Sequence, residues 1–116
     1  MKLRIRGSSI RLRLGQSEVH RLMMQGRIFE TTEFPGTSNL EYGILLTPDA
    51  QLSATFDVGE IHVGLPRAMA ERWFTTDDVG IEATHGSLKI LIEKDFECSN
   101  PDESQADAFP NPNKCS

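Results

Sequence analysis

The sequence predicts a mainly β domain of the α+β class, with eight short strands and two short helices. Three observations predict it. Charged and apolar residues alternate in several runs, turn-forming residues separate these runs, and the order strand, strand, helix, strand, strand occurs twice. The chain has 116 residues, an ordinary length for one domain with a single core, and 38% of them are hydrophobic.

The first two strands are predicted by strict alternation of basic and apolar residues in 2–6 (KLRIR) and 9–14 (SIRLRL), with Gly7–Ser8 as the turn. Successive side chains of a strand point to opposite faces, so one face of this hairpin is apolar and the other cationic. The expected inward residues are Leu3, Ile5, Ile10, Leu12 and Leu14. The expected outward residues are Lys2, Arg4, Arg6, Arg11 and Arg13.

A short helix follows in SEVHRLMMQG, where Val19, Leu22 and Met23 have helical spacing and Gly26 can form the C-cap. Strands are predicted over 27–34 and 39–46. The residues between them, PGTS, are typical of a turn.

The second half repeats this order. Strands over 51–57 and 60–65 form a hairpin around Val58–Gly59, and Pro66 is expected as the first residue of a helix, PRAMAERWFTT. Its core face is expected to carry Met69, Ala70, Trp73 and Phe74. A last hairpin is predicted over 79–84 and 87–94, with His85–Gly86 at its turn.

The two halves, 2–47 and 51–95, match at an offset of about 51 residues and predict a pseudo-twofold repeat. Two short helices cannot cover both faces of a flat sheet. We therefore expect a small, closed or nearly closed β-barrel with the two helices at its ends, either swapped-hairpin or double-psi-like. Residues 1–96 form the expected domain, and 97–116 an acidic, proline-containing strap.

Residues 61–92 resemble the swapped-hairpin fold of bacterial transition-state regulators and antitoxin N-terminal domains. The resemblance is carried by Leu65-Pro66-Arg67 at the helix start, Trp73 near its end, the stretch TDDVGIE and Gly86. It implies a dimeric DNA-binding regulator as one alternative. The start MKLRIRGSSIRLRLGQSEV, with LKILIEKDFEC and DAFPNP near the end, is also similar to a small group of uncharacterised bacterial proteins. That similarity transfers no activity and no site residue.

Charge is distributed unevenly. The net charge is −5, yet residues 1–27 hold seven of the twelve Lys and Arg with only one acid. Such a basic segment predicts either an anionic partner or pairing with the protein's own acids. The cationic residues of the first hairpin are the predicted contact surface. A protein partner or self-association is favoured over nucleic acid, because no aromatic side chains are interleaved with these cations for base stacking.

No motif predicts catalysis, a cofactor or a metal. The chain lacks a glycine-rich phosphate loop and a serine elbow, and the paired Asp77 and Asp78 have the position of solvated loop residues. The candidate Cys and His ligands lie at least 13 positions apart, unlike zinc motifs. These residues are His20, His62, His85, Cys98 and Cys115. The expected function is a small non-enzymatic binding module; the alternatives are the DNA-binding regulator and a small barrel enzyme.

The sequence has neither an apolar run of membrane length nor a signal peptide pattern, so a soluble, cytoplasmic protein is expected. In that compartment Cys98 and Cys115 are expected to stay reduced. The tail between them is expected to act as a strap anchored by Phe96 and Phe109. Its acids, Asp102, Glu103 and Asp107, would then lie over the basic hairpin.

Overall fold

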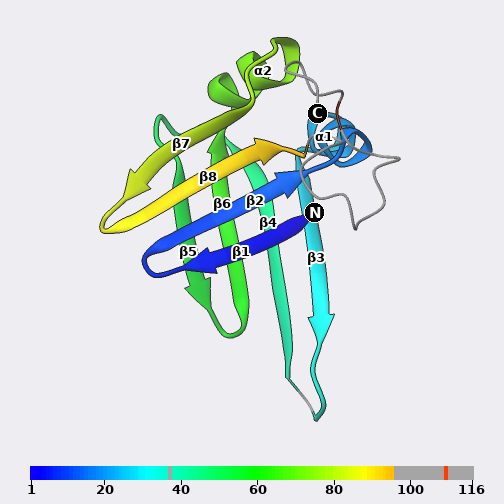
Figure 1. The fold of residues 1–116 in the computed structure, drawn as a ribbon, viewed down its shortest axis with the longest axis vertical. Helices are drawn as coiled ribbons and strands as arrows, with labels where there is room; N and C mark the ends of the chain where they lie inside the picture. The colour runs from blue at the N-terminus through cyan, green and yellow to red at the C-terminus, as the bar shows by residue number, and fades with distance from the viewer. Residues whose placement is uncertain (37, 96–108, 110–116) are drawn as a thin grey trace, which may run out of the picture.

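The computed structural model describes residues 1–36, 38–95 and 109, which form eight strands and two helices (Figure 1). The first half comprises β1 (Lys2–Arg6), β2 (Ser9–Leu14), α1 (Gln16–Gln25), β3 (Arg27–Glu33) and β4 (Asn39–Thr47). The second half comprises β5 (Ser53–Asp57), β6 (Glu60–Pro66), α2 (Arg67–Thr75), β7 (Gly80–His85) and β8 (Leu88–Lys94). The mainly β, α+β class predicted from the sequence is confirmed.

The strands form two four-stranded sheets with the orders β1-β2-β8-β7 and β3-β4-β6-β5. Each sheet combines one antiparallel hairpin from each half of the chain, joined by a parallel pair, β2 with β8 or β4 with β6. Figure 1 shows the first sheet in front of the second, with both helices near the ends of β2, β8 and β6. Among the described residues, neither helix therefore covers the outer face of a sheet.

The described strands do not close into a barrel, so this part of the expectation is wrong, and the swapped-hairpin and double-psi-like arrangements stay predictions. Among the described residues, β1 and β7 are the edges of one sheet and β3 and β5 the edges of the other. The two helices act as crossovers between the sheets, since α1 follows β2 and leads to β3, and α2 follows β6 and leads to β7. A pair of packed sheets buries the same apolar faces without closure. The pseudo-twofold relation between the halves stays a prediction.

The core lies between the sheets and under the helices. Trp73 is only 1% exposed and its indole N–H donates a 3.1 Å hydrogen bond to the carbonyl of Val79. The central strands and the helices supply most of the rest: Ile10, Leu12, Leu14, Val19, Leu22, Ile28, Ile44, Leu52, Ile61, Val63, Leu65, Ala70, Ile90 and Ile92. The core positions predicted on β2 and at Trp73 are thus confirmed.

Three local expectations need correction. Ile5 was expected in the core but is 60% exposed, because it lies on an edge strand next to the turn. Met69 is also exposed, while Ala70 is buried, so the buried stripe of α2 is narrower than predicted. Pro66 is the last residue of β6 rather than the first of the helix, which begins at Arg67.

A polar cluster holds the start of β1 against the rest of the domain. The amino group of Met1 contacts the carboxylate of Glu18 and lies 2.8 Å from that of Glu30. Glu18 also accepts a hydrogen bond from the backbone N–H of Gly15 at the start of α1, and Tyr42 donates one to Glu30. These contacts tie β1 to α1, β3 and β4. They fix the edge strand that carries Lys2, Arg4 and Arg6.

Burial lowers the pKa of the Met1 amino group, but its two carboxylate partners outweigh that effect and the net pKa is raised. For Glu30, burial acts to raise the pKa, and the hydrogen bonds from the amino group and Tyr42 reverse the direction and lower it. Both groups are therefore held in their charged forms. The paired ionisation explains how a charged amino group is tolerated at a partly buried position.

Candidate anion-binding face

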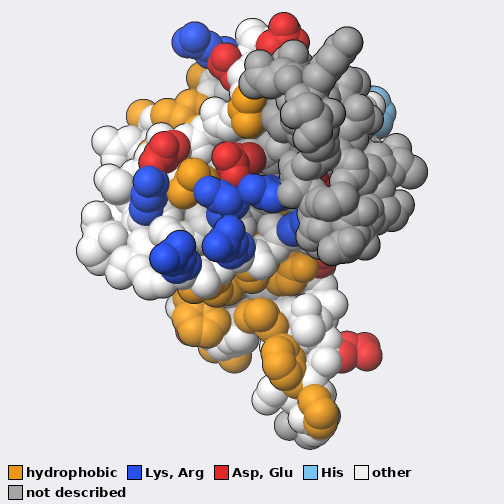
Figure 2. Space-filling view, viewed as in Figure 1, with side chains coloured by type: hydrophobic (Ala, Val, Ile, Leu, Met, Phe, Trp, Pro, Cys, Tyr) orange, Lys and Arg blue, Asp and Glu red, His pale blue; other side chains and the backbone are white. Residues whose placement is uncertain are grey.

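The outer face of the first sheet carries all five cations predicted for the hairpin. In the β1–β2 pair, Lys2 lies opposite Arg13, Arg4 opposite Arg11, and Arg6 opposite Ser9. Ile10, Leu12 and Leu14 of β2 point into the core, so the residues between them point outward. Figure 2 shows Lys and Arg side chains gathered in the middle of this face.

The neighbouring strand β8 adds a sixth cation, Lys89. The parallel β2–β8 pairing places Lys89 opposite Ser9, Leu91 opposite Arg11 and Glu93 opposite Arg13. Sequence reasoning missed Lys89, because alternation predicts its face of the sheet but not which distant strand lies beside it. We call the outward surface of Lys2, Arg4, Arg6, Arg11, Arg13 and Lys89 the cationic face.

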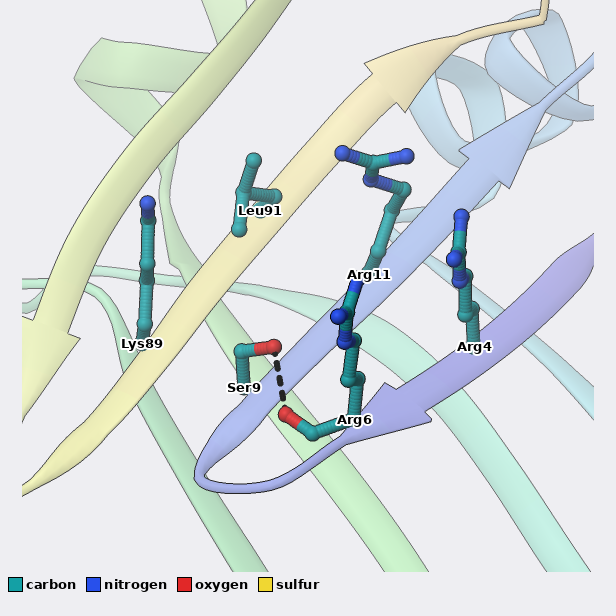
Figure 3. A pocket seen from close by; sticks show the side chains of 6 residues that line it. All are labelled: Arg4, Arg6, Ser9, Arg11, Lys89 and Leu91. Carbon is teal, nitrogen blue, oxygen red and sulfur yellow. Dashed lines mark hydrogen bonds between the residues drawn. The ribbon is translucent and has the colours of Figure 1, made fainter.

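A hollow of about 230 Å³ opens on this face, and among the described residues that line it none is a carboxylate. Figure 3 shows the six lining side chains, which come from three adjacent strands: Arg4 and Arg6 from β1, Ser9 and Arg11 from β2, and Lys89 and Leu91 from β8. The Ser9 hydroxyl donates a 2.8 Å hydrogen bond to the carbonyl of Arg6, which ties the two strands together beside the turn. The hollow is therefore lined by several N–H donors and positive charges.

A second, smaller hollow of about 140 Å³ continues the cationic face toward the start of β1. It is lined by Lys2, Arg4, Arg11 and Arg13, and so shares Arg4 and Arg11 with the first hollow. The two hollows together form a strip that is lined mainly by cations. A strip of this kind suits an extended ligand with several negative charges better than a single ion.

Part of the cationic face is neutralised by the protein's own acids. Glu93 lies between two arginines, with its Oε1 3.0 Å from Nε of Arg11 and 3.7 Å from Nε of Arg13. Lys2 Nζ lies 2.7 Å from the carboxylate of Asp95. The intramolecular pairing that the sequence leaves open is therefore present at this end of the face.

The cations at the other end of the cationic face, near the β1–β2 turn, are less neutralised by acids of the described residues. Arg4 and Arg6 are exposed residues of an edge strand, and within the described part of the chain neither forms an ion pair. Lys89 pairs with Glu82 at 2.7 Å, but both side chains are about half exposed, so this pair holds Lys89 only weakly. Arg4, Arg6 and Lys89 are the cations most available to a ligand.

An apolar pocket of about 400 Å³ lies on the other side of the same hairpin, between the two sheets. Figure 2 shows hydrophobic side chains directly below the cationic ones. Ser9 lines both this pocket and the cationic hollow, and Ile5 and Phe56, at 60% and 73% exposure, stand at its mouth. The cationic face is thus bordered by an exposed apolar edge.

The remaining candidates from the sequence are scattered. His20 is exposed on α1, while His85 accepts a 3.0 Å hydrogen bond at Nδ1 from the backbone N–H of Ala54. Asp78 pairs with Arg72 at 3.4 Å, which leaves the Asp77–Asp78 pair an ordinary surface feature. Cys98 and Cys115 lie outside the described residues. The sequence did not predict that three potential metal ligands meet on the second sheet. They are Glu41, Glu60 and His62.

Neither α1 nor α2 has the length and the apolar surface needed to cross a bilayer. The resemblance of residues 61–92 to swapped-hairpin regulators stays a prediction. In the structure this stretch contributes β6 to one sheet and β7 and β8 to the other. Comparison with curated proteins and with solved structures finds no match to the chain. A family model matches residues 1–113, and the chain accordingly belongs to a family of unknown function, DUF7009.

Proposed function

We propose that the protein is a binding module whose cationic face takes an acidic segment of a partner protein. The observation that carries this proposal is the hollow lined by Arg4, Arg6, Arg11 and Lys89, whose lining includes no carboxylate from the described part of the chain. An anion placed there would gain charge-assisted hydrogen bonds from several donors at once. It would also relieve the repulsion between Arg4 and Arg11, which face each other across the hairpin.

The rest of the molecule favours a protein segment over a long nucleic acid. The net charge of −5 means that the surface away from the cationic face repels a polyanion. The outward residues of β1, β2, β7 and β8 include no aromatic side chain on which a base could stack. A short acidic segment along the strip needs neither feature.

The acidic strap, residues 97–116 of the same chain, would compete with a partner protein for the cationic face. Asp95 pairs with Lys2, and its backbone carbonyl accepts a 2.7 Å hydrogen bond from the N–H of Phe109, so Phe109 lies close to one end of the strip. Phe109 also packs against the core and lies under Lys94, with Nζ 5.5 Å from its ring centre. Phe96, Asp102, Glu103 and Asp107 lie outside the described residues. The acidic strap remains our proposal, supported by the position of Phe109.

The test measures binding of a fluorescent oligoglutamate peptide to the intact chain by anisotropy at low and moderate salt. Replacing Arg4 and Arg6 by Gln should weaken binding at least about tenfold, because two charge-assisted contacts are lost. The matched control is Arg21→Gln with Arg67→Gln, two exposed cations outside the face, which changes the net charge equally. Equal weakening by the two double variants would show that net charge, rather than this face, attracts the peptide and would overturn the proposal.

Two further measurements separate the alternatives. Neutralising Asp102, Glu103 and Asp107 to Asn, Gln and Asn should tighten peptide binding if the strap competes; unchanged affinity would refute the strap but leave the partner site. Duplex DNA is titrated under the same conditions. Tighter binding of DNA than of the peptide, sensitive to the Arg4 and Arg6 substitutions, would replace our proposal with the DNA-binding alternative.

A further inference from the structure

Three potential metal ligands meet on the outer face of the second sheet, the one without the cationic face. β4 and β6, neighbouring parallel strands in Figure 1, pair with Glu41 opposite Glu60 and Gly43 opposite His62. Residues two apart on a strand share a face, so Glu60 and His62 both point away from the buried Ile61 and Val63. The backbone register alone therefore gathers two carboxylates and one imidazole.

The donor atoms lie close together without bonding to one another. His62 Nε2 is 4.0 Å from Oε2 of Glu41 and 3.9 Å from Oε2 of Glu60, and one donor atom from each residue lies within 4.8 Å of the others. These separations are too long for hydrogen bonds. They are wider than the about 3.3 Å between neighbouring donors of a tetrahedral zinc site, so metal binding requires the side chains to rotate toward one another.

The Nε2 atom of the His62 imidazole is shielded from solvent and has no hydrogen-bond partner among the described residues. Buried polar atoms are almost always satisfied, so an orphaned ring nitrogen between two carboxylates calls for an explanation. A cation bound between the three side chains would satisfy this nitrogen and both oxygens at once.

Packing holds the ring in place. The His62 ring lies against Phe29 of β3, with ring centres 5.0 Å apart and planes at 57°. Phe29 reaches across β4 because Gly43 has no side chain; a Cβ there would lie 2.1 Å from Phe29 Cδ1. The imidazole is therefore positioned by an aromatic neighbour rather than by its own polar contacts, which reduces the ordering that metal binding would require.

The surrounding charge also favours a cation. Glu41 and Glu60 face each other directly, and Asp57 of β5 lies opposite Glu60 on the other side. Within the described part of the chain, no Lys or Arg forms an ion pair with any of these three acids. Like charges in such a row repel one another, and a divalent ion would reverse this effect.

We propose that Glu41, Glu60 and His62 form a site for a divalent transition metal ion of the Zn²⁺ type. Two carboxylate oxygens and one imidazole nitrogen suit such an ion, whereas Mg²⁺ and Ca²⁺ favour ligand sets made of oxygen alone. Three protein ligands leave at least one coordination position for water or another ligand. The site lies on the other sheet from the cationic face and does not depend on the function proposed for that face.

The experiment titrates Zn²⁺ alone into the intact, EDTA-treated chain by calorimetry and follows thermal unfolding through the single tryptophan, Trp73. We expect one equivalent to bind and to raise the unfolding midpoint. Glu60→Gln and His62→Gln should each weaken binding at least about tenfold and abolish the rise in midpoint, because each removes one of three ligands. Glu60→Gln also removes the Glu41–Glu60 repulsion, so this variant should fold at least as well without metal.

Two controls exclude other ligands. His20→Gln removes an exposed histidine of α1, and Cys98→Ser with Cys115→Ser removes both thiols; each should leave Zn²⁺ affinity unchanged. Loss of binding in the cysteine variant, or full binding in His62→Gln, would overturn the proposal. So would the absence of any heat or midpoint shift at millimolar Zn²⁺, or equal affinity for Mg²⁺.

Discussion

Arg4 and Arg11 face each other directly across the β1–β2 pair, on the outer side of the first sheet. Like charges at opposite positions of a strand pair destabilise it, by roughly 0.2–1 kcal/mol. Glu93 compensates Arg11 with a 3.0 Å contact, but within the described residues Arg4 has no ion pair. This arrangement costs stability and exposes a cation, as expected at a binding surface.

Replacing Arg4 by Gln should therefore raise the free energy of unfolding by about 0.5 kcal/mol, while it weakens binding of acidic peptides. Urea unfolding followed through Trp73 fluorescence measures the first effect. Arg21→Gln, an exposed residue of α1 outside the pair, serves as the control and should change stability by less than the Arg4 variant. A loss of 1 kcal/mol or more on replacing Arg4, about the size of a real ion pair, would mean that it makes a stabilising contact.

Tyr42 should titrate far above a free tyrosine. Its partial burial and its hydrogen bond to Glu30 raise its pKa from 10.0 to about 12. It is the only tyrosine in the chain, so the ultraviolet absorbance of tyrosinate reports this residue alone. The absorbance midpoint should lie near pH 12 in the folded protein and fall to about 10 in concentrated urea.

The same shift makes stability depend on pH. Because the folded pKa is raised, the folded state holds its proton longer, so this contribution is complete below pH 10 and is lost as the pH rises toward 12. Tyr42→Phe should lack this loss, and Trp73 fluorescence verifies that the protein is folded at each pH. A folded-state midpoint near 10 would show that the contact with Glu30 does not hold the phenol neutral.

Much of the fold follows from local sequence pattern. The alternating cations predict the face and register of the first hairpin, and glycines at Gly7, Gly26 and Gly86 mark chain reversals that require the positive φ values observed. These signals are local, since each involves residues only a few positions apart. They specify hairpins and helix ends, but not which hairpins share a sheet.

The sequence does not predict which strands lie in the same sheet. The parallel pairing of β2 with β8 joins residues about 80 positions apart, Ser9 with Lys89 for example, and the alternation within each strand is compatible with several neighbours. The incorrect barrel and the omission of Lys89 have this common cause. Ile5 is exposed because β1 is an edge strand, and a strand with one neighbour leaves its apolar side chains partly uncovered.

The proposed metal site was not predicted, for a related reason. Glu60 and His62 are two apart on a predicted strand, which indicates a shared face, but zinc motifs are recognised by the spacing of Cys and His, which leaves Glu60 out. Glu41 lies on the preceding hairpin and joins them through the β4–β6 register. A carboxylate two positions from a histidine on one strand, as in Glu60 and His62, predicts two of the three ligands.

Gly43 should tolerate no side chain. A Cβ at this position would lie 2.1 Å from Cδ1 of Phe29 and 2.3 Å from the backbone carbonyl of Ile28. Gly43→Ala should lower the free energy of unfolding by about 2–3 kcal/mol, as overpacking a fixed backbone does. Chemical denaturation measures the loss. Gly64→Ala is the control, because its Cβ would meet side chains of Ser53 and Thr47 that can rotate, and it should cost less. A neutral Gly43→Ala variant would show that Phe29 moves freely, and would weaken the argument that it positions His62.

Lys94 is a buried cation on the inward side of β8, 8% exposed, at the position opposite Leu14. Burial lowers its pKa, and the charges of Asp77 and Asp78 reverse only part of this effect. The unfolded chain therefore binds the proton more tightly, so stability rises with pH as it approaches 10.5, and the charged form is a cost at pH 7. Lys94→Met loses the 2.8 Å hydrogen bond to the carbonyl of Thr76, an exposed residue that water can solvate. It also loses the contacts of the ammonium with the rings of Trp73 and Phe109, whose centres lie 5.8 and 5.5 Å from Nζ. We expect the variant to be about 1 kcal/mol more stable at pH 7, and the gain to shrink as the pH rises toward 10.5.

Lys89→Met, on the outward side of the same strand, should show neither effect. A destabilised Lys94→Met variant would mean that the bond to Thr76 and the ring contacts outweigh the cost of burying the charge.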